Sequence, residues 1–168
     1  MVKQIINFNF FRSAKNTFKK EIDSLSKIPL NLDSKNYNKF CQEILNNKGN
    51  LFLMGIGKSG NIAEKICSTL SSTGTPAIYI NAAEASHGDL GMLTKRDLLI
   101  IFSFSGETEE ILKILPSCKK KVKNILSVTG SKKSTLSQNS KLSITLMIDE
   151  EACPMDLAPT TSSTSMLL

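Results

Sequence analysis

The chain has 168 residues, 40% of them hydrophobic and 21% charged, which is the composition of an ordinary soluble domain. That length supports one domain with a well-packed core and is short for two, and no apolar run approaches the length of a membrane-spanning helix. The formal net charge of +6 favours anionic small molecules over nucleic acid, because the lysines are dispersed and only two tyrosines are present to interleave with them.

The four cysteines, Cys41, Cys67, Cys118 and Cys153, are far apart and form no C-x-x-C pair, so neither a zinc site nor a disulfide is expected. Cys67 and Cys118 lie among helical apolar residues and are expected in the core, whereas Cys153 lies in a loop. Residues 1–12 lack the small-residue cleavage site of a signal peptide. We therefore expect a mature N-terminus and a cytoplasmic protein with no membrane or nucleic-acid partner.

Two helices are expected before the first strand, within residues 1–48. The first covers residues 8–26, where apolar positions recur at helical spacing, and Pro29 is expected to end it. The second covers residues 34–46. Such helices either cover the sheet or pack against a second subunit. The apolar positions are Phe11, Ala14, Phe18, Ile22 and Leu25 in the first helix and Tyr37, Phe40, Cys41, Ile44 and Leu45 on the inner face of the second.

Residues 49–168 alternate between short apolar strands and helices. This predicts a parallel sheet with helices on both faces, because each crossover connection places its helix on a face. The predicted fold class is a single α/β domain, a three-layer αβα sandwich with a five-stranded parallel sheet, doubly wound as in flavodoxin. The strands are expected at residues 51–54, 77–80, 98–102, 124–128 and 142–147, and the helices at 61–71, 108–120 and 134–139. The lysine cluster at 119–121 then lies at a solvated helix end.

Residues 51–60 read LFLMGIGKSG, an apolar run of strand length that breaks into glycines and then enters a helix. Such a turn presents backbone N–H groups and a helix N-terminus to an anion. The phosphate loop of nucleotide triphosphatases is excluded, since its first glycine would fall at Phe52. Gly55, Gly57 and Gly60 match the dinucleotide pattern G-x-G-x-x-G, but Asn81 stands where an acidic residue should hold the ribose. A tight turn that binds nothing is a further alternative.

Three other loops follow strand ends and therefore meet at the same edge of the sheet. After the third strand, SFSGET combines alternate hydroxyls, a glycine and a helix start, which fits either a phosphate-binding loop or an ordinary serine N-cap. The loop after the second strand contains His87, the only histidine. After the fifth strand, Glu151 and Cys153 precede a run of hydroxyl residues that resembles a helix start.

Four stretches together resemble a known family. GIGKSG, STGTPAIYINAAEASHGDLGML, SFSGETEE and EEACPMDLAPTTSST are similar to the sugar isomerase (SIS) domain of bacterial D-arabinose 5-phosphate isomerases, enzymes of the Kdo pathway. The similarity covers about residues 51–164. The S-x-S-G-E-T loop alone would indicate only a phosphosugar-binding domain, whereas the A-S-H-G-D and E-A-C-P segments indicate this particular isomerase.

The resemblance implies interconversion of D-ribulose 5-phosphate and D-arabinose 5-phosphate through an enediol, without a redox cofactor. It implies that Lys58, Glu110 and Glu151 are catalytic, since a carboxylate can move the proton and a lysine can stabilise the oxyanion. The plain alternatives are a Lys58 that only binds phosphate, an ordinary first-turn carboxylate at Glu110 and a solvated side chain at Glu151. The substrate-binding positions that it implies are Gly57, Ser59, Gly74, Thr75, Asn81, His87, Ser103, Ser105, Gly106 and Thr108.

The chain departs from the family pattern at three points. Asn81 stands where the family often has a histidine associated with inhibitory zinc, so we expect weaker zinc sensitivity and no metal site. The paired regulatory CBS domains of longer members are absent. The chain also ends at Leu168, where the final helix should begin and before a further catalytic histidine of the family.

We therefore expect a truncated domain that forms a homo-oligomer, a dimer or tetramer, and isomerises its substrate poorly by itself. The alternative function is a SIS module that binds a phosphosugar or nucleotide sugar with little catalysis. A dinucleotide-dependent oxidoreductase is disfavoured by Asn81.

Overall fold

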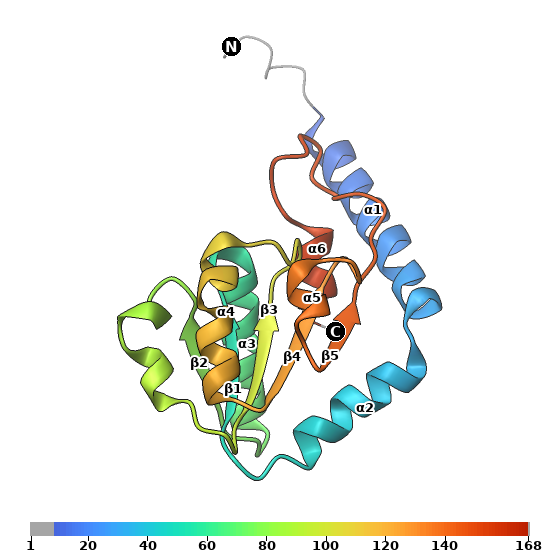
Figure 1. Cartoon of the computed structure of the whole chain (residues 1–168). Helices are drawn as coiled ribbons and strands as arrows, with labels where there is room; N and C mark the ends of the chain where they lie inside the picture. Colours follow the sequence, from blue (N-terminus) through green and yellow to red (C-terminus); the bar gives the residue numbers. More distant parts are fainter. Residues whose placement is uncertain (1–8, 168) are drawn as a thin grey trace.

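A parallel five-stranded sheet forms the centre of the computed structural model, which describes residues 9–167 (Figure 1). The strands are β1 (Leu51–Gly55), β2 (Ala77–Asn81), β3 (Leu98–Phe102), β4 (Asn124–Thr129) and β5 (Leu142–Thr145). Their order is β2-β1-β3-β4-β5, and every neighbouring pair is parallel. This order confirms the predicted doubly wound fold.

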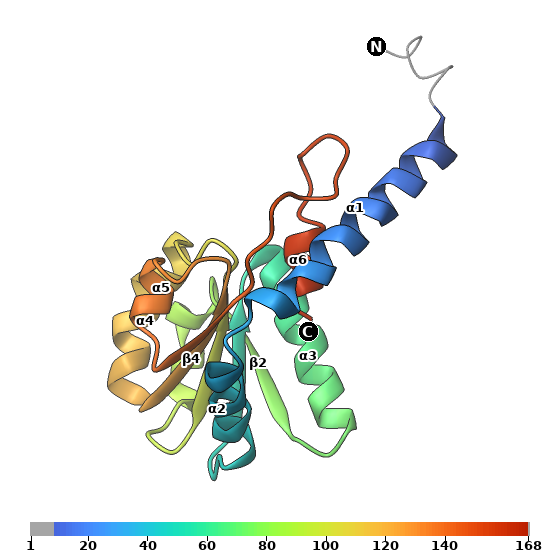
Figure 2. The same cartoon turned by 90° about the vertical axis from the view of Figure 1, so that its right-hand side faces the viewer.

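Helices cover both faces of the sheet. α4 (Glu109–Lys121) and α5 (Thr135–Gln138) lie on one face, and α3 (Gly57–Ser72) and α6 (Thr161–Ser165) lie on the other (Figure 2). Every residue of β1 and β3 is buried, and alternate side chains enter two apolar clusters. Leu99 belongs to the cluster under α4, and Leu98 to the cluster under α3. The uninterrupted apolar strands are what a parallel sheet covered on both faces requires.

Two helices, α1 (Phe10–Asn31) and α2 (Ser34–Leu45), run past the β5 edge of the sheet (Figure 1). Side chains cap both: Asn9 accepts the Arg12 N–H at 2.8 Å, and Asp33 accepts the Asn36 N–H at 3.0 Å. The prediction that Pro29 ends the first helix is wrong. α1 continues to Asn31, because a proline in the last turn removes only one backbone hydrogen bond.

Residues 9–167 leave the apolar stripe of α1 uncovered. Phe11, Phe18 and Ile22 are 71%, 71% and 64% exposed, and α1 projects away from the sheet (Figure 2). In α2, Phe40 is buried as predicted, but Leu45 is 80% exposed because it is the last residue of the helix. Within residues 9–167, no helix is both long enough and apolar enough to cross a membrane.

Two further element boundaries that bear on the site differ from the prediction. α3 begins at Gly57 instead of residue 61, because Gly57 adopts a φ of +58° and the chain turns directly from β1 into the helix. Lys58 and Ser59 therefore lie in the first helical turn and not in a loop. β5 ends at Thr145, and Met147, which was predicted inside the strand, is exposed.

Candidate active site

The strand order reverses between β1 and β3. The chain leaves β1 through α3 on one face and leaves β3 through α4 on the other, so two helix N-termini start from neighbouring strands at the carboxyl edge of the sheet. Lys58 stands in the first turn of α3, and Glu110 stands in the first turn of α4. The fold thus places these two charged side chains on the two sides of the point where α/β sheets bind ligands.

The turn from β1 into α3 depends on close backbone contact. A Cβ at Gly55 would lie 2.9 Å from the backbone of Gly60, and a Cβ at Gly60 would lie 2.6 Å from the Tyr79 hydroxyl. Tyr79 in turn donates to the Gly55 carbonyl at 3.2 Å. Together with the positive φ of Gly57, these contacts explain the G-x-G-x-x-G pattern without a dinucleotide.

The N-termini of α3 and α4 lack side-chain caps within the described part of the chain. Ile56 precedes α3 and Thr108 precedes α4, and neither side chain hydrogen-bonds to the first turn. By contrast, the side chains of Asn9, Asp33 and Ser134 cap α1, α2 and α5. The uncapped N–H groups are therefore available to an external acceptor, and the helix dipoles favour an anion there.

The loop at residues 103–108 is folded by its own hydroxyl groups. Ser103 is buried, its Oγ accepts the Gly106 N–H at 3.0 Å, and the same atom lies 2.8 Å from Thr108 Oγ1. Ser105 is exposed and accepts the Glu107 N–H at 3.2 Å. Ser103 therefore holds the shape of the loop, and Ser105 presents a hydroxyl to a ligand.

The loop at residues 130–134, between β4 and α5, supports the loop at residues 103–108, and the sequence-based prediction did not include it. A side chain at Gly106, where φ is +65°, would collide with Ser134. Glu107 Oε1 accepts the Thr135 N–H at 2.6 Å. The sequence signal for this loop was the Thr-Gly-Ser stretch at residues 129–131. It begins at the last residue of β4 and therefore lies at the same edge of the sheet.

Glu151 lies at the start of α6. Its Oε2 accepts the Thr160 N–H at 2.7 Å, the Thr160 hydroxyl at 3.1 Å and the Ser162 N–H at 3.2 Å. Partial burial acts to raise the pKa of this carboxyl, but hydrogen bonds from Ser162 and Thr160 outweigh it and hold the pKa below its ordinary value. These bonds stabilise the fold above the unfolded-state pKa, and the stabilisation is lost as the pH falls through the lowered pKa.

Asn81 and His87 are exposed on the carboxyl side of β2. Asn81 pairs with Gly55 in the sheet, and its Oδ1 accepts the Ala83 N–H at 3.0 Å. His87 ends a short 3-10 helix, η2 (Ala85–His87), which precedes a second one, η3 (Asp89–Met92). Among residues 9–167, no three His, Cys, Asp or Glu side chains gather closely enough to hold a metal ion.

Gly74 and Thr75 lie away from the other predicted residues. They follow the C-terminal end of α3, whereas Lys58 lies at its N-terminal end. A helix of 16 residues is about 24 Å long. Within one chain, the structure therefore does not bring this pair to the carboxyl edge, and its contact with substrate stays a prediction.

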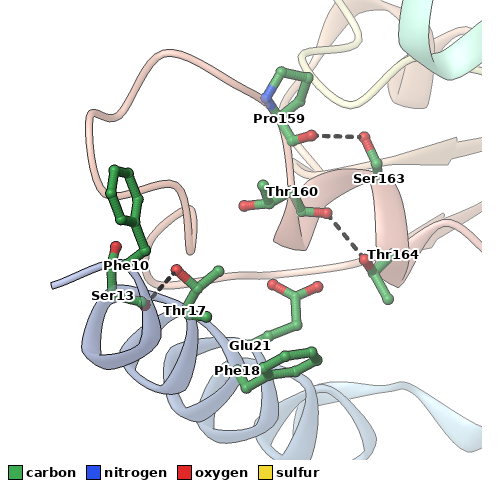
Figure 3. A pocket seen from close by; sticks show the side chains of 10 residues that line it. Phe10, Ser13, Thr17, Phe18, Glu21, Pro159, Thr160, Ser163 and Thr164 are labelled. Atoms are coloured by element: carbon green, nitrogen blue, oxygen red, sulfur yellow. Dashed lines mark hydrogen bonds between the residues drawn. The ribbon is translucent and has the colours of Figure 1, made fainter.

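A hollow of about 670 Å³ opens between α1 and the start of α6 (Figure 3). Phe10 and Phe18 line it on the α1 side, and Thr160 lines it on the α6 side. One carboxylate oxygen of Glu21 accepts the Thr161 hydroxyl at 2.7 Å, and the other is buried without a hydrogen-bond partner among the described residues. Because Thr160 also donates to Glu151, this hollow adjoins the support of that carboxylate.

The doubly wound fold with two open helix N-termini at this edge belongs to a known class: residues 44–168 match the SIS domain, and the chain belongs to that family. It is 46% identical over 152 residues to arabinose 5-phosphate isomerase KpsF of Escherichia coli O6:H1, across 90% of this chain and 46% of that protein. It is 43% identical over 159 residues to arabinose 5-phosphate isomerase KdsD of Francisella tularensis, across 93% and 48%. The chain spans about half the length of these curated relatives.

A solved structure agrees with this assignment. The structure of E. coli CFT073 c3406 in complex with arabinose 5-phosphate matches with a TM-score of 0.89 and 36% identity, across 96% of this chain and 85% of that chain. The match confirms the predicted SIS fold and the resemblance to arabinose 5-phosphate isomerases.

Cys153 lies in the loop between Glu151 and α6. Backbone N–H groups of Leu157, Ala158 and Met155 hydrogen-bond to its sulfur and lower the pKa of the thiol below its ordinary value. Burial raises the pKa of the Cys118 thiol to about 11. Because the thiolate is the reactive form, Cys153 should be the more reactive of the two.

We expect iodoacetamide to alkylate Cys153 at least about tenfold faster than Cys118 at roughly pH 7. Peptide mass spectrometry over a time course measures both rates, and the Cys153 rate should level off at a lower pH than that of an ordinary thiol. Cys41, which is also half-buried, is the matched control. Equal rates at Cys153 and Cys41 would show that the loop N–H groups do not activate the sulfur.

Proposed function

We propose that this chain is the catalytic domain of an aldose-ketose isomerase that interconverts D-ribulose 5-phosphate and D-arabinose 5-phosphate. The observation that carries the proposal is the pair of uncapped helix N-termini at the β1–β3 switch point, with Lys58 on one and Glu110 on the other. The names of the two curated relatives and the arabinose 5-phosphate bound in the similar solved structure support the choice of substrate.

The reaction moves a carbonyl group between C1 and C2 of the sugar. A base removes the proton from the carbon beside the carbonyl, an enediol forms, and the proton is returned to the neighbouring carbon. We assign proton transfer to Glu110 and Glu151, and stabilisation of the intermediate oxyanion to Lys58. Glu151 is ionised at neutral pH and can accept a proton, and its lowered pKa makes it a weaker base than an ordinary glutamate.

The phosphate group is assigned to the loop at residues 103–108 and the N-terminus of α4. Ser105 offers its hydroxyl, and the first-turn N–H groups after Thr108 offer donors that no side chain in the described structure occupies. Gly57 and Ser59 lie in the first turn of α3, at the same edge of the sheet, and are assigned to substrate binding. Asn81 and His87, which follow β2 at this edge, are assigned to the sugar hydroxyls.

We place this activity in the cytoplasm and in Kdo and lipopolysaccharide biosynthesis. The four cysteines are free, as is usual where cellular thiols are kept reduced. The pathway rests on the family resemblance of the motifs.

Replacing Glu110 with Gln should remove proton transfer and leave the fold intact, because the side chain is exposed in the first turn of α4. With ribulose 5-phosphate in D2O, NMR should show deuterium entering the sugar and arabinose 5-phosphate forming. We expect Glu110→Gln to slow both by roughly 10²–10⁴-fold without a change in Tm. Glu109→Gln, at the adjacent exposed position, is the control and should stay within about twofold. Unchanged exchange and product formation in Glu110→Gln would exclude this carboxylate as the base.

Replacing Ser105 with Ala should weaken sugar-phosphate binding by about 1.5–3 kcal/mol, because it removes a hydrogen bond to a charged acceptor. Isothermal titration calorimetry with arabinose 5-phosphate measures the Kd. Ser26→Ala, at an exposed serine of α1, is the control. Unchanged affinity in Ser105→Ala would exclude this hydroxyl from the phosphate site.

We further propose that the chain forms a homo-oligomer through the apolar stripe of α1. Phe11, Phe18 and Ile22 lie on this stripe and remain largely exposed. Lys15 stacks over the Phe11 ring at 4.8 Å but leaves the stripe open. A second copy that packs on α1 would bury this surface and close the hollow beside α6.

The double substitution Phe18→Lys and Ile22→Lys should weaken self-association by roughly 3–6 kcal/mol, since two large side chains lose their burial. Sedimentation equilibrium of both forms measures the effect. Leu45→Lys, an equally exposed apolar position on α2, is the control. A monomeric parent chain, or an equal shift in the control, would contradict the assignment of α1 as the interface.

A further inference from the structure

A cationic groove lies at the amino edge of the sheet, away from the candidate active site. It has a volume of about 820 Å³ and is formed by the second half of α2 and the turns that precede β1, β3, β4 and β5. The strands run parallel, so this edge is opposite the one that carries Lys58 and Ser105. Five cationic side chains line the groove, Lys39, Lys48, Lys95, Arg96 and Lys141, against one carboxylate, that of Glu43.

Most of these cations have no carboxylate partner. Glu43 Oε1 lies 2.8 Å from Lys141 Nζ, so the one carboxylate is already paired. The other four cations form no ion pair with any residue in the described range 9–167. The dipole of α2 can account for only one of the four, Lys48, which follows the end of that helix by three residues. Lys39 lies inside α2, and Lys95 and Arg96 lie in the turn before β3. A bound anion would relieve their mutual repulsion.

The turns that carry these cations are held in place by polar contacts. Asp97 is 2% exposed, and its two carboxylate oxygens accept the Asn50 N–H at 2.8 Å and the Thr94 N–H at 2.7 Å. This clamp ties the turn before β1 to the turn before β3. A side chain at Gly49 would collide with the Arg96 carbonyl, so the two turns are also in direct backbone contact. The positions of the cationic turns are therefore set before any ligand arrives.

Amide side chains complete the lining. Gln42 and Asn46 can donate hydrogen bonds to a ligand's oxygens. Asn47 instead holds the turn before β1, where its amide nitrogen donates to the carbonyls of Gly49 and Asn50 at 3.0 and 3.1 Å, and Asn124 Oδ1 accepts from Lys141 at 3.1 Å. The lining residues include no aromatic ring on which a nucleobase could stack. A groove of this volume is in the range that encloses a small organic ligand.

We propose that this groove is a second ligand site, separate from the isomerase site, for a small molecule that carries at least two phosphate groups. The four unpaired cations match its charge, and the amide groups match its remaining hydroxyl or carbonyl oxygens. The proposal is independent of the function assigned to the carboxyl edge.

Calorimetric titration of the full chain with inorganic triphosphate tests the site. The double variant Lys48→Gln, Arg96→Gln removes two cations that make no side-chain hydrogen bond in the described structure, so the fold should persist; a matching Tm checks this. We expect its Kd for triphosphate to rise by roughly tenfold or more. The control Lys65→Gln, Lys113→Gln makes the same change in net charge on the exposed surfaces of α3 and α4, and its Kd should rise by less than about twofold at physiological ionic strength.

Four results would overturn the proposal. The first is an absence of triphosphate binding to the parent chain, and the second is an equal loss of affinity in the two double variants, which would indicate net charge alone. The third is a loss of triphosphate binding in Ser105→Ala, which would place the anion at the carboxyl edge. A single-stranded oligonucleotide that displaces triphosphate with far higher affinity and a steep salt dependence would replace the small ligand with a nucleic acid.

Discussion

The close packing of β1 against the start of α3 is the contact on which the candidate active site depends. Without side chains at Gly55 and Gly60, the strand and helix backbones touch, and the chain enters α3 at Gly57 with no intervening loop. Lys58 is thereby held in a first helical turn. The parallel ladder between β1 and β3 then places the loop after β3 next to this turn, because it pairs Met54 with Ile101, each one residue before the end of its strand. A larger residue at either glycine would move the helix start away from the strand that supports it.

The helix N-termini fall into two groups, those capped by a side chain of this chain and those whose first N–H groups are left for a ligand. The N-termini of α1, α2 and α5 are satisfied by their own N-cap side chains, and α6 uses the carboxylate of Glu151. Among the α-helices of residues 9–167, only α3 and α4 begin without a side chain that caps the first turn. Glu151 has two roles, one in the structure and one assigned in catalysis. The hydrogen bonds that it accepts from the start of α6 also lower the pKa of this carboxylate, to which proton transfer is assigned. A lower pKa keeps the group ionised but reduces its basicity.

A parallel sheet gives the domain two chemically different edges. Helices begin at the carboxyl edge, so its polar groups are backbone N–H donors, the loop hydroxyls and a few charged first-turn side chains. Helices end at the amino edge, where turns carry the cations of the groove and Asp97 holds two of those turns together. Both edges therefore suit anions, but the first does so through oriented N–H groups and the second through side-chain charge. The residues assigned to the carboxyl edge and the residues that line the groove do not overlap. Substitutions can therefore test the two sites separately.

The sequence by itself determined the fold class and, apart from the end of β5, the strand positions, and it proposed the residues of the candidate site. Buried parallel strands are local apolar runs, and a phosphate-binding turn is a local pattern of glycine and hydroxyl residues, so both are readable from a few consecutive positions. Only the tertiary structure decided what covers each surface. Helical periodicity showed that Phe11, Phe18 and Ile22 share a face, but the protruding direction of α1 left that face exposed. The amino-edge groove was likewise hidden, because its cations come from separate segments that only the strand order brings together. Periodicity is a short-range property of the chain, whereas exposure and charge clustering depend on which distant segments pack side by side.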